Sequence, residues 1–228
     1  MKKRSCLHVK LLLVHCVILF AFIGCASRKV KLTETGFLSS YSDLRKTGDS
    51  GRMRVYRNPK AGIAQQYSKI IIAPVQFQLD QTVNAGKLND EDQEQLAGYF
   101  HEQLKERLNK NYTITDSPGS DVLIIRSAIT NIVPNIGVLN INMISLFSGS
   151  GLGGASLEAE LVDSMTGERI LAFVDARKGR KFKKGFAKWG HTEEAMEFWA
   201  DAIVVHLDNL MGKYQTEVIT KQAPTQNF

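Results

Sequence analysis

The first 24 residues of the chain have the order of charge and hydropathy found in secretory signal peptides. Basic residues at positions 2–4 give a positive start, and an apolar run broken only by His15 extends over residues 11–23. A helix that spans a bilayer needs about 20 apolar residues, so this run is too short for a membrane anchor but suits the central region of a signal peptide. We therefore predict that residues 1–24 are removed and that the folded protein consists of residues from 25 onward.

The end of this segment resembles the lipobox of bacterial lipoproteins, which consists of an apolar, a variable and a small residue before a cysteine. Phe22-Ile23-Gly24-Cys25 has this order, with Phe22 in place of the commoner leucine. The resemblance implies cleavage after Gly24, a thioether-linked diacylglycerol on Cys25 and acylation of its new amino group. Two or more acyl chains hold a protein stably on a membrane. Ala26 stands after the cysteine where aspartate would favour retention at the inner membrane, so the resemblance implies the outer membrane. The alternative is an uncleaved anchor helix with an incidental cysteine.

Composition limits the chemistry of the remaining residues 25–228. Without the four basic residues of the leader, 25 Lys and Arg face 23 Asp and Glu, a formal charge of +2 instead of +6. The sequence pI of about 9.2 is therefore poor evidence for nucleic acid, which is not a predicted partner. Cys6 and Cys16 leave with the leader and Cys25 is acylated. The domain is thus predicted to have no disulfide, no cysteine-bound metal and no cysteine nucleophile.

The mature chain is predicted to contain one domain. Residues 25–35 are the lipidated N-terminus and a linker, residues 36–214 form a single α+β domain, and residues 215–228 are a disordered tail. No internal repeat is present.

Hydrophobic periodicity predicts the elements of this domain. Apolar residues at helical spacing predict a helix that begins at Asn89-Asp90, and another that is opened by Thr192 and ended by Gly212. Strands are predicted over residues 67–79, 112–114, 121–133, 155–163 and 169–177. Gly36 to Arg57 is expected to be a short helix or turn. The order β-α-β-β-β-β-α predicts a mostly antiparallel β-sheet with two helices on one face.

Four blocks of sequence carry a family resemblance. They are Gly36–Tyr41, Val55–Pro59, Ala155–Asp163 with Thr166–Glu168, and Phe198–Ala200. In this order they resemble the proteobacterial lipoproteins grouped as the uncharacterised family DUF3313, over roughly residues 35–212. The third block, with its Glu-Ala-Glu-Leu and Asp…Thr-Gly-Glu, is the most specific part. The resemblance implies a location in the cell envelope and an α+β fold, and it implies no activity.

The carboxylates of the third block are candidates for acid–base chemistry or for a hard metal ion. Glu158 and Glu160 are two residues apart on a predicted strand and therefore share one face. No nucleophile or histidine stands near them at a recognisable spacing. A solvated strand face, or partners for the basic residues near position 180, is the favoured interpretation. Asp163 is predicted to make an Asx turn into Thr166-Gly167.

The remaining motifs favour structural roles. Residues 149–154 match G-x-G-x-x-G, but a strand comes after them where a dinucleotide-binding fingerprint needs a helix. His191 and Glu194 share a helix edge, yet two ligands do not make a zinc site. His206 lies on the apolar stripe of the last helix and is predicted to be a core histidine. We expect no cofactor and no metal.

The basic–aromatic segment, residues 177–189, is the strongest candidate for a binding site. Its seven cations interleave with three aromatic residues, Phe182, Phe186 and Trp189. The cations are Arg177, Lys178, Arg180, Lys181, Lys183, Lys184 and Lys188. Such a pattern suits an anionic membrane surface, lipopolysaccharide phosphates or a polyanionic glycan. The alternative is a solvated connection whose aromatic side chains pack inward.

A second segment, residues 136–147, is nearly uncharged and apolar. It is a core strand or hairpin, or an exposed loop that meets a membrane or a protein. The core interpretation is favoured, because a domain of this size needs the strands.

Together these features predict a non-enzymatic, outer-membrane-anchored lipoprotein on the periplasmic side. It would bind another envelope component, either a protein or an anionic glycolipid such as lipopolysaccharide. The alternative function is a structural or assembly accessory subunit of a larger envelope complex.

Overall fold

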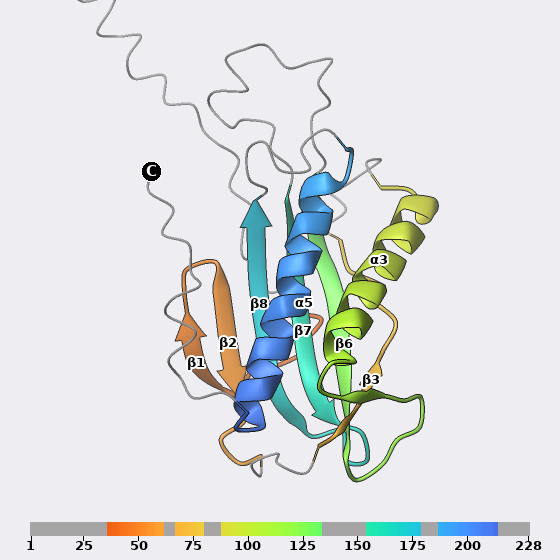
Figure 1. Ribbon diagram of the computed structural model, residues 1–228. Coiled ribbons are helices and arrows are strands. Elements are labelled where there is room, and N and C mark those ends of the chain that lie inside the picture. The colour runs from red at the N-terminus through yellow and green to blue at the C-terminus, as the bar shows by residue number, and fades with distance from the viewer. Residues whose placement is uncertain (1–35, 62–66, 80–87, 134–153, 179–186, 214–228) are drawn as a thin grey trace, which may run out of the picture.

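The computed structural model describes residues 36–61, 67–79, 88–133, 154–178 and 187–213. Within them, eight strands form one sheet and two helices pack on it (Figure 1). The strands are β1 (Arg45–Asp49), β2 (Met53–Arg57), β3 (Lys69–Ile72), β4 (Gln76–Phe77), β5 (Thr113–Ile114), β6 (Val122–Val133), β7 (Gly154–Asp163) and β8 (Arg169–Lys178). The helices are α3 (Asp90–Leu108) and α5 (Gly190–Leu210).

The sheet has the order β1-β2-β8-β7-β6-β3-β5, and β4 also pairs with β6. The pairs from β1 to β6 along this order are antiparallel, whereas β3 pairs in parallel with both β5 and β6. The sheet is therefore mixed but mostly antiparallel, and the predicted α+β fold is confirmed.

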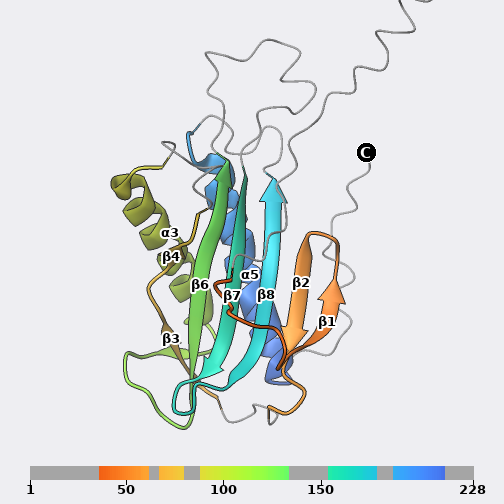
Figure 2. The same cartoon turned by 180° about the vertical axis from the view of Figure 1, so that it is seen from behind.

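Both helices cover the same face of the sheet, as the two views from front and back show (Figures 1 and 2). The side of α3 that faces the sheet consists of buried Leu96, Phe100, Leu104 and Leu108. The corresponding stripe of α5 consists of buried Met196, Trp199, Ile203, Leu207 and Leu210. These stripes join the apolar residues of β3, β6, β7 and β8 in one core. His206, predicted for the same stripe, is half-buried.

The N-terminus of α3 lies where the sequence predicts it. The Asn89 side chain accepts a hydrogen bond from the Asp92 backbone N–H at 2.8 Å. Acidic residues 90–92 occupy the first turn, where the helix dipole favours negative charge. This helix start is encoded within a few residues.

Three predicted elements differ from the structure. Gly36 to Arg57 contains the β1–β2 hairpin and is not a helix or turn alone. The last helix begins at Gly190, so Thr192 lies inside its first turn and is not its cap. The strand predicted over residues 67–79 is two short strands, β3 and β4. Neither helix of the described residues has the length and hydropathy needed to cross a bilayer.

Candidate functional site

The first three sequence blocks that carry the family resemblance meet on the face of the sheet that has no helix. Residues 36–44, which we call the N-terminal strap, cross β7 and β8 on this face before β1 begins (Figure 2). Leu38 of the strap is 1% exposed and packs in a small cluster with Tyr56, Ala172 and Val174. The strap is thus a packed part of the domain, directly after the predicted linker.

Glu158 and Glu160 of β7 lie under and beside this strap. Glu158 is fully buried and accepts a hydrogen bond from the Leu38 backbone N–H at 3.4 Å, and Glu160 is 7% exposed. The prediction of a solvated strand face is therefore wrong. A buried carboxylate needs hydrogen-bond donors or a cation, and the strap and two arginines supply them.

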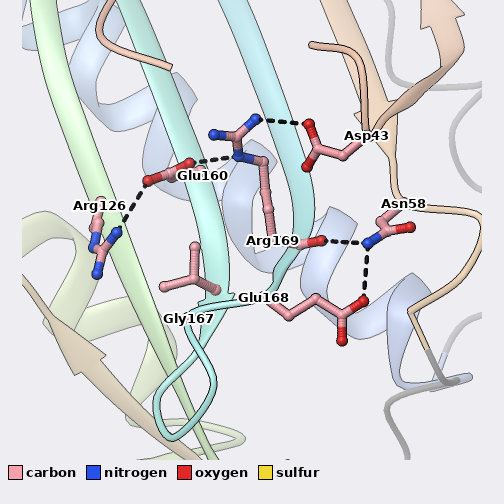
Figure 3. A pocket seen from close by; sticks show the side chains of 8 residues that line it. Asp43, Asn58, Arg126, Glu160, Gly167, Glu168 and Arg169 are labelled. Carbon is pink, nitrogen blue, oxygen red and sulfur yellow. Dashed lines mark hydrogen bonds and ion pairs between the residues drawn. The ribbon is translucent and has the colours of Figure 1, made fainter. Parts of the chain in front are cut away.

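Arg169, the first residue of β8, joins the strap to β7 (Figure 3). Its Nε lies 2.7 Å from Glu160 Oε2, and its Nη1 lies 3.3 Å from Asp43 Oδ1. The same guanidinium donates to two strap carbonyls, at 2.5 Å to Ser40 and 3.0 Å to Leu38. The planar fork of donors on an arginine suits this role, which a single ammonium could not fill.

The turn between β7 and β8 is held by its own carboxylates. Asp163 Oδ1 accepts from the Met165 and Thr166 backbone N–H groups at 2.9 and 2.7 Å, which confirms the predicted Asx turn. Tyr67 donates to the other carboxylate oxygen at 2.8 Å. Burial acts to raise the pKa of Asp163, but these donors outweigh it and lower the pKa below 3.8. Asp163 therefore has a structural role.

The second sequence block reaches the same turn through Asn58. Its Nδ2 donates to Glu168 Oε1 at 3.1 Å and to the Arg169 carbonyl at 3.0 Å. The blocks are thus linked by hydrogen bonds into one unit around the start of β8.

A cavity of about 380 Å³ lies over this unit. Its lining consists of Asp43, Asn58, Arg126, Glu160, Val162, Gly167, Glu168 and Arg169. Arg126 of β6 reaches Glu160 Oε1 with one nitrogen at 3.4 Å, and its side chain is 46% exposed. Its other donors have no partner among the described residues, so Arg126 is the lining group most able to hydrogen-bond an acceptor from outside. Nothing in the lining is a nucleophile activated by a base, and the arrangement suits fixing the strap and contacting a polar ligand.

Replacing Arg169 with alanine should lower the free energy of unfolding by about 3 kcal/mol, because it leaves Glu160 largely buried without its close cation. Arg126→Ala is the matched control, since its longer and half-exposed contact to the same carboxylate should contribute less than about 1 kcal/mol. Urea denaturation of both variants measures the difference. Equal losses for the two arginines would contradict the role given to Arg169.

The described ends of the basic–aromatic segment are occupied by contacts within the protein. Arg177 Nε lies 2.7 Å from Asp175 Oδ2, and the Arg177 guanidinium stacks 3.0 Å from the centre of the Phe198 ring. At the other end, Lys188 Nζ and Trp189 Nε1 both lie 2.7 Å from the Asp92 carboxylate of α3. Trp189 is 5% exposed and belongs to the core, so its prediction as a surface contact is wrong.

The other predicted cations of this segment lie outside the described part of the chain. They are Arg180, Lys181, Lys183 and Lys184, together with the side chain of Lys178. Cys25 and the apolar residues 136–147 also lie outside it, as does the glycine motif except for Gly154, which begins β7.

Asp175 is a buried carboxylate that sequence reasoning did not single out. It is fully buried on β8, and its Oδ2 accepts from Trp199 Nε1 at 2.7 Å as well as from Arg177. Among the described residues its Oδ1 has no hydrogen-bond partner. Burial raises the pKa of Asp175 above 3.8, although Arg177 and Trp199 oppose this. The only local signal of its burial was its place in β8, because Asp175 shares the inward face of this strand with Phe173 and Leu171.

The histidines do not assemble a metal site in the described part of the chain. His191 is buried at the start of α5, and His101 lies half-buried on α3. No group of three or more histidine, cysteine, aspartate or glutamate side chains is placed to hold a metal ion among the described residues. His206 was predicted to be a core histidine but is half-buried on α5, with its ring 6.5 Å from that of Phe173, and burial lowers its pKa.

Sequence reasoning found the carboxylates of the site but missed the groups that contact them. Arg169, Arg126, Asn58 and Asp43 were not predicted. Hairpin register was a usable signal for Arg169, because a turn over residues 164–168 pairs Val162 with Arg169 and sets Arg169 beside Glu160. Asn58 lies in the second resemblance block, which assigned it no role, and no local signal marked Asp43, which comes from a distant part of the chain.

Comparison with known proteins gives one family and several distant structures. The model of the family described as "Protein of unknown function (DUF3313)" matches residues 33–203. No curated protein matches the chain.

Three solved structures illustrate the structural similarity. PelC from Paraburkholderia phytofirmans, a dodecamer, is 12% identical at a TM-score of 0.38 and covers 64% of this chain and 93% of its own. A DUF4136 family protein from Bacteroides thetaiotaomicron is 13% identical at a TM-score of 0.35, with 70% and 97% covered. Lipoprotein GNA1162 from Neisseria meningitidis is 13% identical at a TM-score of 0.30, with 62% and 99% covered. TM-scores this low support no inference about the present chain.

Proposed function

The chain belongs to the DUF3313 family, whose activity is unknown, and we propose that it is a lipid-anchored envelope protein with a binding role. This function is argued from the residues of the chain itself. In this proposal Cys25 carries the lipid, the protein faces the periplasm from the outer membrane, and the domain binds another envelope component without catalysing a reaction. The N-terminal sequence supports the anchor, and the placement of the strand ends supports the binding surface.

The strap supports the proposed anchor by fixing where the tether meets the domain. Residues 26–35 separate Cys25 from the strap, and extended chain spans at most about 3.3–3.6 Å per residue, or about 35 Å in total. The ten residues of β7 extend over about 33 Å, so a fully extended tether is about as long as a strand that the strap crosses. The proposal therefore does not specify which end of the sheet faces the membrane.

The observation that carries the proposed binding surface is the register at one end of the sheet. Val133 pairs with Gly154, and Gly154 pairs with Lys178. The chain that contains the apolar residues 136–147 leaves and re-enters at the first pair, and the basic–aromatic segment departs from Lys178 beside it. Two segments of unusual composition thus start at neighbouring strand ends.

Contacts within the protein reduce the set of residues that are available to bind a ligand. Arg177 and Lys188 are paired with Asp175 and Asp92, so the remaining candidates are Lys178, Arg180, Lys181, Lys183 and Lys184, with Phe182 and Phe186 among them. Each cation near an anionic surface contributes about 1 kcal/mol, and salt screens the attraction beyond a Debye length. The proposed ligand is an anionic glycolipid or lipid headgroup surface, and no cofactor is needed.

Changing Lys181, Lys183 and Lys184 together to glutamine should weaken binding to lipopolysaccharide or anionic vesicles at low salt, because three cations are removed from the proposed surface. The test uses the protein without residues 1–25, so that lipid does not hold it on the vesicles, and measures co-sedimentation. Lys60, Lys105 and Lys110, all exposed on the described domain, provide a control triple change of equal charge. Exposed changes of this kind should each alter stability by less than about 0.5 kcal/mol. Absence of binding by the unchanged protein, or equal loss in both triples, would reject the proposed surface.

The alternative function is an accessory subunit of a larger envelope complex. The specific feature that favours it is the nearly uncharged segment 136–147, which starts beside the same strand ends and would suit a protein interface. Crosslinking in intact envelopes separates the two. One stoichiometric protein partner supports the accessory subunit, and a co-purifying glycolipid supports the binding protein.

A further inference from the structure

The face that carries the helices is covered unevenly. Helix α3 packs on β3 and β5, and α5 packs on β7 and β8. In Figure 1 the last turns of α5 reach the end of β2, and the rest of the β1–β2 hairpin extends beyond α5. Val55 of β2 is buried in the main core, whereas Met53 on the same face is half-buried.

A groove of about 510 Å³ lies between this hairpin and the last turns of α5. Its floor is apolar, with Met53 and Val55 of β2 beside Leu171 and Leu210. Arg57 and His206 stand at its sides. Burial lowers the pKa of His206, so the imidazole adds no charge to the groove at neutral pH.

Charge in the groove favours an acidic occupant. Of the charged residues that line the groove, Asp49 already pairs with Lys46 and Arg54, which leaves the Arg57 cation. The guanidinium of Arg57 is half-buried and has no hydrogen bond or ion pair among the described residues. A half-buried cation is stabilised by a carboxylate that reaches it.

The chain leaves the described structure next to this groove. Helix α5 ends at Leu210, which lines the groove, and Gly212 reverses the backbone with φ +68°. The Lys213 N–H donates to the Asp208 carbonyl at 2.8 Å, which completes a Schellman-type end. Fifteen residues, 214–228, come after this point.

The sequence of these residues fits the groove. Thr216-Glu217-Val218-Ile219-Thr220 is rich in β-branched residues, which favour extended chain, and Glu217 is the only acid in residues 214–228. In an extended chain Glu217 and Ile219 share one side about 6.6 Å apart, the same spacing as Arg57 and Val55 on β2. Strand β2 points toward the end of the molecule where α5 ends (Figure 1). A chain that turns back from Lys213 therefore meets Arg57 first and Val55 next.

We propose that residues 216–220 bind in this groove as extended chain, with Glu217 paired to Arg57 and Ile219 packed over Val55 and Met53. The segment is then the third element that covers the helix-bearing face. A sequence that is disordered alone can order on an apolar groove that it reaches without leaving its own chain. The proposal differs from the disordered tail predicted for residues 215–228 only at residues 216–220. It is independent of the ligand of the basic–aromatic segment.

Hydrogen–deuterium exchange of the full-length protein tests the proposal. Amides of residues 216–220 should exchange at least about tenfold more slowly than in a synthetic peptide of residues 214–228. Glu217→Arg, which changes only the tail, and Arg57→Glu should each abolish this protection, and the double variant should restore it. Lys105→Glu, on the exposed side of α3, which packs on β3 and β5, is the control and should leave protection intact.

Three results would overturn the proposal. They are peptide-like exchange in the unchanged protein, protection that both charge reversals leave intact, and protection that disappears on dilution, which would assign the groove to a second copy of the chain. If Arg57→Glu unfolds the domain, Glu217→Arg and the double variant still test the proposal. Restored protection in the double variant requires the ion pair between residues 57 and 217 as well as a folded domain.

Discussion

Replacement of Trp199 by alanine is expected to lower the free energy of unfolding by about 3–5 kcal/mol, the largest effect of any single change in the described core. Trp199 is fully buried on α5, and its ring meets Phe100 of α3 edge-on at 6.1 Å. It therefore holds the two helices together as well as packing on the sheet. Its Nε1 also donates to buried Asp175, so alanine removes both a large apolar volume and a donor. Chemical denaturation measures the loss, and a change below about 1 kcal/mol would contradict this packing.

Trp199→Phe separates the two contributions and predicts a pH dependence. Phenylalanine keeps much of the apolar volume but removes the donor to Asp175. The folded pKa of this carboxyl is raised, so its charged form destabilises the fold above about pH 4, and this cost disappears as the pH falls through the folded pKa. Without the tryptophan donor the cost should grow. The stability difference between Trp199→Phe and the unchanged protein should therefore be larger at pH 7 than near pH 4, and a difference independent of pH would rule out the hydrogen bond as its source.

Elements whose cause is local could be predicted from the sequence. The start of α3 is set by the Asn89 side chain and the acids of the first turn, all within four residues. The β7–β8 hairpin is set by Asp163, whose carboxylate binds the backbone N–H groups of the turn it begins. In both cases the side chain that decides the structure lies beside the backbone that it fixes.

Elements whose cause is distant could not be predicted in the same way. The β1 strand is mostly exposed, so it shows little apolar alternation, and β2 is held by pairing with β8 from the other end of the domain. The start of α5 has no side-chain cap. It is positioned by Trp189, which donates to Asp92 of α3, a contact between residues 97 positions apart in the chain.

The same distinction explains the candidate site. Glu158 and Glu160 were found because they form a local pattern, but their burial depends on the strap, which arrives from residues 36–44. The alternation of side chains along a strand shows that two residues share a face of the sheet. It does not show whether another segment covers that face. The basic–aromatic segment gave the opposite error, because Trp189 is buried and donates to Asp92 of α3, a contact that its neighbours in sequence do not reveal.

Cys25→Ala should abolish acylation completely and leave an unprocessed precursor at the inner membrane, because the thioether forms on this sulfur and processing comes after it. The resemblance of residues 22–25 to a lipobox and the short apolar run before them are the basis of this expectation. Labelled palmitate measures acylation, and the shift in mass on a gel measures removal of residues 1–24. A single acyl chain binds a membrane only marginally whereas two or more hold it stably, so loss of all of them should change fractionation as well as labelling.

Cys16→Ala is the matched control, since it makes the same change inside the predicted leader and should leave labelling and processing intact. The pair distinguishes the proposed lipidation from a general effect of altering the N-terminus. Palmitate incorporation that persists in Cys25→Ala, or an unchanged chain length in the normal protein, would instead favour an uncleaved anchor. In that case residues 36–44 would still pack on the sheet, but the chain before them would continue from a helix in the membrane. The reach of about 35 Å calculated from Cys25 would then no longer set the distance of the domain from the bilayer.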